Sequence, residues 1–101
     1  MSQRPHESGP ASTGLGYWML NYRSSSFYRE DLSFRDVAPA LYVGLTGYIG
    51  YPHRSFDELL PRLRQRYEHV RGDSPLPWEQ AAPIARKAWE RARAEVRGEG
   101  R

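Results

Sequence analysis

The stretch SFDELLPRLRQRYEHV, residues 55–70, decides the fold class of this chain. Its apolar residues recur every three or four positions, which places them on one face of a helix. They are Phe56, Leu59, Leu60, Leu63, Tyr67 and Val70. Ser55 and Glu58 have the spacing of a capping box, in which each residue satisfies a backbone N–H of the other. The stretch therefore predicts an amphipathic helix that begins after Ser55, with Gly72 as a candidate for its C-terminal cap.

The start of this helix is one of three similar segments that are spaced 22 residues apart, and such a period indicates a repeat. The segments FRDVAP (34–39), FDELLP (56–61) and WEQAAP (78–83) each begin with an aromatic residue and end with proline. The third continues into an alanine-rich run, and alanine favours helices. The apolar residues of that run share one helix face: Trp78, Ala81, Ala82, Ala85, Ala88, Trp89, Ala92 and Val96.

The first of the three segments continues into a glycine-rich stretch, ALYVGLTGYIGY, at 40–51. Glycine lowers helix propensity by about 1 kcal/mol per residue relative to alanine. The spacing of Gly44, Gly47 and Gly50 also suits a close backbone contact along one helix face. We expect a helix through about residue 47, with helix, strand and loop all open for residues 43–51.

Together these patterns predict a small all-α domain of three main helices, built from the 22-residue repeat and spanning residues 15–97. An aromatic segment precedes it, either as a short helix or as an extended arm. Leu, Ile, Val and Phe number only 18 of the 101 residues, so we expect a thin core rich in aromatic side chains. Residues 1–14 and 98–101 are expected to be disordered tails.

The composition limits the kinds of function open to the chain. It has no cysteine, which excludes disulfides and thiolate metal sites. Its 15 basic and 12 acidic residues give a net charge of +3. No apolar run is long enough to serve as a membrane span or a secretory signal, so we expect a cytoplasmic protein with no membrane partner. A chain of 101 residues is also too short for a large enzyme with a deep cleft.

Four segments resemble a family of small, functionally uncharacterised bacterial proteins with aromatic, acidic and proline-containing helical segments. The segments are YWMLNYRSSSFY (17–28), FRDVAPALYVG (34–44), SFDELLPRLRQRYE (55–68) and PWEQAAPIARKAWER (77–91). Related segments occur beside general-stress-type domains. The resemblance implies a bacterial protein with an association with stress. It assigns no catalytic or binding residue.

The sequence contains no arrangement of residues that is typical of a catalytic or metal site. The histidines His6, His53 and His69 lack metal-ligand spacing, and the serines at 24–26 lack the turn that presents a nucleophile. The glycines at 44, 47 and 50 do not match a phosphate-binding loop. We therefore predict no enzymatic activity, metal, cofactor or small-molecule substrate.

Two binding hypotheses follow. Tyr42, Tyr48 and Tyr51 lie off the apolar stripes, and tyrosine is enriched at interface hot spots. The leading hypothesis is a non-enzymatic protein-interaction module that uses this surface to bind a protein partner or a second copy. The alternative is a weak, salt-sensitive nucleic-acid binder that uses one helix face with three arginines: Arg86, Arg93 and Arg97. Glutamates in the same sector also fit an ordinary solvated, ion-paired face.

Overall fold

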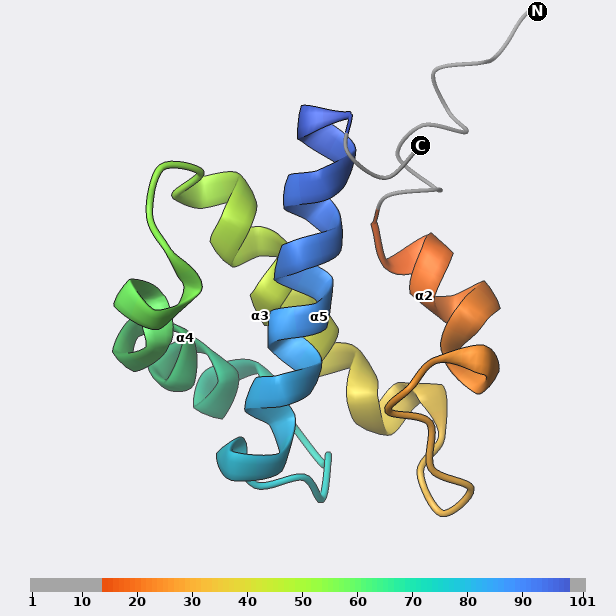
Figure 1. Cartoon of the computed structure of the whole chain (residues 1–101). Helices are drawn as coiled ribbons and strands as arrows, with labels where there is room; N and C mark the ends of the chain where they lie inside the picture. The colour runs from red at the N-terminus through yellow and green to blue at the C-terminus, as the bar shows by residue number, and fades with distance from the viewer. Residues whose placement is uncertain (1–13, 99–101) are drawn as a thin grey trace, which may run out of the picture.

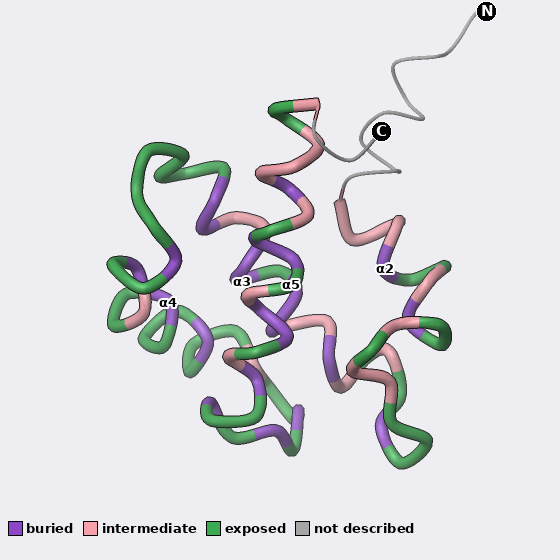
Figure 2. Tube along the Cα trace, in the orientation of Figure 1, coloured by how far each residue is buried: buried purple, intermediate pink, exposed green. Residues whose placement is uncertain are grey.

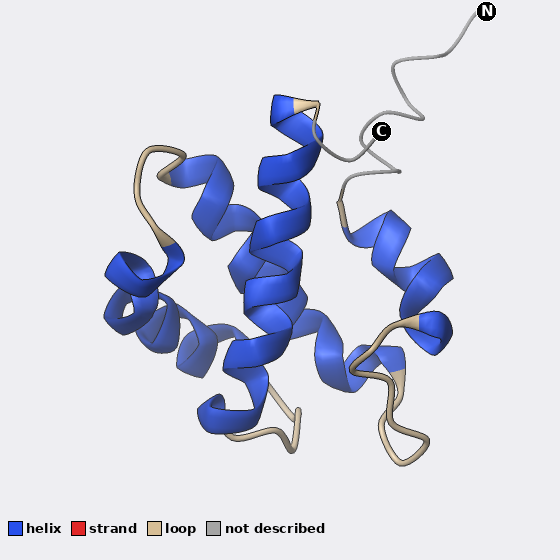
Figure 3. Cartoon of the chain, in the orientation of Figure 1, coloured by secondary structure: helices blue, strands red, loops and turns tan. Residues whose placement is uncertain are grey.

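The computed structural model describes residues 14–98, and this part consists of helices and loops with no strand (Figure 3). The all-α prediction is therefore confirmed for the described residues. The helices are α2 (Leu15–Asn21), the short 3-10 helix η1 (Tyr22–Ser24), α3 (Phe34–Gly50), α4 (Phe56–Val70) and α5 (Trp78–Arg97). The tails predicted to be disordered lie outside the described residues, apart from Gly14 and Gly98, which cap α2 and α5.

The three long helices begin at the three aromatic residues that lead the repeated segments. The capping box of α4 is confirmed: the Ser55 backbone N–H donates to Glu58 Oε1 (2.9 Å), and the Glu58 N–H donates to Ser55 Oγ (3.1 Å). At the start of α3, the Ser33 N–H donates to the Asp36 carboxylate (3.0 Å). At the other end of α4, Gly72 follows the last helical turn with a positive φ of 54°, which suits glycine.

The glycine-rich stretch is helical through Gly50, three residues beyond the expected end of the helix. Close helix packing explains this. A Cβ atom added to Gly44 would collide with the carbonyl oxygen of Ala85, and one added to Gly47 would lie 2.7 Å from Leu63 Cδ2. The helical backbone of α3 can approach its neighbours this closely only because these side chains are absent, and the packing outweighs the low helix propensity of glycine.

α3 and α5 cross at the centre of the molecule, with α4 on one side and α2 on the other (Figure 1). The buried positions gather where these helices meet (Figure 2). As the composition predicts, many of the buried residues are aromatic: Trp18, Tyr22, Tyr48, Phe56, Tyr67, Trp78 and Trp89. Large rings therefore contribute much of the contact between the helices, beside the aliphatic side chains of α3 and α4.

The N-terminal aromatic segment forms a short helix, which settles the choice between helix and extended arm. Its Trp18 and the following Tyr22 are buried. The Tyr22 hydroxyl donates to the Leu32 carbonyl oxygen (3.0 Å), which ties η1 to the residues before α3. In the same loop, hydrogen bonds from the Arg29 guanidinium hold the pKa of Asp31 below its usual value. These bonds organise the approach of the chain to α3.

Candidate functional site

The three predicted surface tyrosines do not form one patch. Tyr48 is only 5% exposed, and its ring packs edge-on against Trp89 with centroids 5.8 Å apart. The prediction that Tyr48 belongs to a contact surface is wrong, because α5 covers the side of α3 on which Tyr48 lies. Tyr42 and Tyr51 are both half-exposed. Tyr42 lies in the middle of α3, whereas Tyr51 follows the last helical residue and has a non-helical backbone.

Tyr51 is attached to α4. The Arg62 Nη1 donates to the Tyr51 hydroxyl (3.0 Å), and the Arg62 guanidinium lies 4.7 Å from the centre of the tyrosine ring. Tyr51 therefore joins the end of α3 to α4. Its accessible edge belongs to the α3–α4 junction and is separate from the outward side of α3.

Tyr42 belongs to an apolar stripe along one side of α3 that is only partly covered by the other helices. The stripe consists of Ala38, Tyr42, Leu45 and Ile49, and we refer to it as the α3 seam. Its spacings of four, three and four residues are those of the a and d positions of a coiled coil. Charged residues of α3 are confined to Arg35 and Asp36 in its first turn, and none occurs from Val37 to Gly50. The seam is accordingly uncharged along its length.

One end of the seam opens into a shallow apolar groove of about 150 Å³ between α3 and the C-terminal part of α5. Ile49 is 64% exposed and Val96 is 72% exposed on its two sides. Val96 continues the apolar face of α5 but is exposed, because the last turns of α5 project beyond the helices that cover its middle (Figure 1). Glu95, the one charged residue in the groove, is paired with Arg91 (3.1 Å).

The three predicted nucleic-acid contacts lie in two different environments. Arg86 pairs with Asp57 at 2.7 Å and with Glu90 at 3.8 Å, and its guanidinium lies 4.7 Å from the centre of the Phe56 ring. Its charge is therefore balanced by neighbouring carboxylates. Arg93 and Arg97 instead line a pocket with residues of the loop between α3 and α4. No local sequence pattern indicates the contribution of that loop, because it lies about 40 residues away along the chain.

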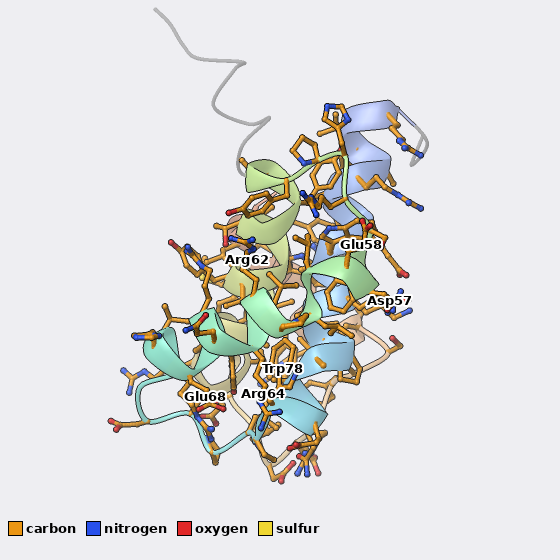
Figure 4. The ribbon with its side chains drawn as sticks, turned by 90° about the vertical axis from the view of Figure 1, so that its left-hand side faces the viewer. Asp57, Glu58, Arg62, Arg64, Glu68 and Trp78 are labelled. Atoms are coloured by element: carbon orange, nitrogen blue, oxygen red, sulfur yellow. The ribbon has the colours of Figure 1, made fainter. Side chains whose placement is uncertain are left out.

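The outward side of α4 carries further arginines, which diverge. Figure 4 shows Arg62 and Arg64 leaving the helix on different sides, with Asp57 and Glu58 near its start. Neither Arg64 nor Arg66 forms an ion pair with any residue of the described range 14–98. The mixed charges and the divergence of the side chains are typical of a solvated helix surface.

Comparison with known proteins assigns no family to this chain. No family model matches it, and neither a curated protein nor a solved structure matches it. The resemblance to the family of small bacterial proteins therefore stays a prediction. Within residues 14–98, no helix combines the length and apolar character needed to cross a membrane, and no group of three or more His, Asp or Glu side chains is placed to hold a metal ion.

Proposed function

We propose that this chain is a non-enzymatic protein-interaction module that pairs with a second copy of itself through the α3 seam. The observation that carries the proposal is the uncharged outward side of α3. A helix that is apolar all round is normally covered on every side. Here α2, α4 and α5 cover only part of α3, and Tyr42 and Ile49 stay accessible on the remainder.

The seam selects a partner of matching chemistry. A charged partner surface would lose its hydration on the seam and gain no ion pair there, which is unfavourable. The seam of a second copy is uncharged and has the same spacing, so its side chains can interdigitate in the manner of a and d residues. Two copies related by a two-fold axis would each contribute the same residues. Val96 and the groove beside Ile49 would extend the contact onto α5.

The proposal keeps the expectation of a bacterial, cytoplasmic protein, with an association with stress taken from the family resemblance. The nucleic-acid alternative through Arg86, Arg93 and Arg97 has less support, because Arg86 is balanced by Asp57 and Glu90. The remaining basic residues do not form a continuous track along α5.

Sedimentation equilibrium over a range of protein concentrations tests the proposed dimer. We expect the wild-type chain to dimerise as its concentration rises. Ile49→Glu would place two carboxylates in an apolar contact, and we expect it to be monomeric at concentrations where the wild type is a dimer. Ile49 is exposed in the single chain, so the variant keeps its helical circular dichroism spectrum.

Leu20→Glu is the matched control, since it also replaces an exposed apolar residue by glutamate. Leu20 is 82% exposed and lies on α2, outside the seam. We expect this variant to dimerise like the wild type. A wild-type chain that is monomeric at all concentrations contradicts the proposal. So does a dimer that Leu20→Glu dissociates and Ile49→Glu leaves intact.

A further inference from the structure

A pocket of about 300 Å³ is lined by the loop between α3 and α4 and by the C-terminal half of α5. Four of its seven lining residues are basic and none is acidic. They are Pro52, His53, Arg54, Ser55, Trp89, Arg93 and Arg97. The loop and the helix contribute two basic residues each. The pocket is therefore a concave site in which positive charge converges from two separate parts of the chain.

Among the described residues, the carboxylates closest in sequence to these side chains have other partners. Asp57 and Glu90 both pair with Arg86, Glu95 pairs with Arg91, and Glu58 accepts a hydrogen bond from the Ser55 backbone. Within the described part of the chain, His53, Arg54 and Arg93 form no ion pair. Bringing these three side chains together without a carboxylate partner is unfavourable. A bound anion would supply a counter-charge for them.

Arg93 is held in place at the wall of the pocket. Its guanidinium lies 5.0 Å from the centre of the Trp89 ring, a cation–π distance. Trp89 itself is buried, and its indole N–H has no hydrogen-bond partner among the described residues. Buried donors normally have an acceptor.

We infer that this pocket binds a phosphate group carried by a small molecule. Arginine guanidinium groups match the oxygens of phosphate and bind them in pairs of parallel hydrogen bonds. Asp57 and Glu58 already occupy the first turn of α4, so the convergent basic side chains carry the inference and the helix end does not. The positively charged surface of α5 is also short, because the charge of Arg86 on the same helix is balanced by Asp57 and Glu90. A single phosphate group fits it better than the backbone of a nucleic-acid strand.

The test is an NMR titration of the full chain with inorganic phosphate and with adenosine monophosphate, using sodium chloride of equal ionic strength as the blank. We expect saturable shifts concentrated at His53, Arg54 and Arg93 and at the Trp89 indole N–H. Arg93→Gln removes a charged hydrogen-bond donor and should weaken binding by about tenfold or more. Arg64→Gln is the matched control on α4 and should leave binding unchanged.

Arg54→Gln, in the loop, is a second variant that tests the pocket without altering α5. The inference is overturned if neither phosphate compound gives saturable shifts, or if Arg64→Gln weakens binding as much as Arg93→Gln and Arg54→Gln do. A single-stranded oligonucleotide is titrated in parallel. If it alone binds, the pocket belongs to a nucleic-acid surface and the small-molecule inference is wrong. None of these outcomes depends on whether the chain dimerises through the α3 seam.

Discussion

α3 and α4 both begin at a phenylalanine that follows a serine cap, and each carries a proline at its sixth position. Beyond this start the two helices differ in their charge and in how many of their sides are covered by other helices. Where α3 has Gly44 and Gly47, α4 has Arg66 and His69, 22 residues further on. α3 packs against α2, α4 and α5, whereas α4 has one buried stripe and a charged outer surface (Figure 4).

The difference shows that a shared helix-start pattern does not determine the role of a helix in the fold. A helix at the centre of a small bundle needs small residues where its neighbours cross, and it has no place for buried charge. A helix at the edge needs only one apolar stripe, and charged residues on its other sides cost little. Three substitutions or sets of substitutions test this comparison.

The largest effect is expected at the buried stripe of α4. Leu63 is fully buried and contacts α3 near Gly47. Leu63→Ala would leave a cavity between the two helices and should lower the free energy of unfolding by about 2–5 kcal/mol. Urea denaturation followed by circular dichroism measures this. Arg64→Ala, on the adjacent exposed position, should stay within about 0.5 kcal/mol of the wild type. Equal losses for the two variants would show that α4 is not held by this stripe.

The three glycines of α3 should respond differently to alanine. Gly44→Ala forces the backbone of α5 to move and should cost about 1–3 kcal/mol. Gly47→Ala meets only the end of the flexible Leu63 side chain and should cost less. A Cβ on Gly50 meets nothing within 4 Å, so Gly50→Ala should raise stability by up to about 1 kcal/mol through helix propensity. Denaturation midpoints of the three variants give the order. Any order in which Gly44→Ala is the mildest would contradict the close α3–α5 crossing.

The smallest effect is expected where α3 and α4 meet at the surface. Arg62→Gln removes the hydrogen bond and the ring contact with Tyr51 and should cost about 0.5–1 kcal/mol. Arg64→Gln has no such contact to lose and serves as its control. Thermal unfolding of the two variants under identical salt conditions compares them. A cost shared equally by both would mean that Tyr51 does not join the two helices.

Much of the fold could be predicted because its signals are local. The aromatic residue that starts each long helix recurs every 22 residues. The apolar stripe of α4 and its capping box depend on residues three or four positions apart. Such residues meet on any helix, whatever surrounds it. The end of α3 was harder to predict, since glycine disfavours a helix by itself and favours one only where another backbone approaches closely.

The candidate surfaces were predicted less well than the helices. Tyr42 lies on an accessible face as expected, but Tyr48 does not. Which residues of α3 are buried depends on which helices pack against it, and α5 packs over Tyr48. Val96 continues the apolar stripe of α5 in sequence and yet is exposed. The stripe extends further along α5 than the helices that pack against it. Arg86 is separated from Asp57 by 29 residues, so their ion pair has no local signature.

The sequence by itself determined that this chain forms helices, where the three long ones begin, and that α4 has a single apolar face. These properties follow from hydrogen bonds and side-chain contacts within one or two helical turns. Only the tertiary structure decided which tyrosine is buried, which face of α3 is left uncovered, and which basic residues converge on one pocket. Those outcomes depend on where helices cross and end, and crossings bring together residues whose separation along the chain carries no periodic signal.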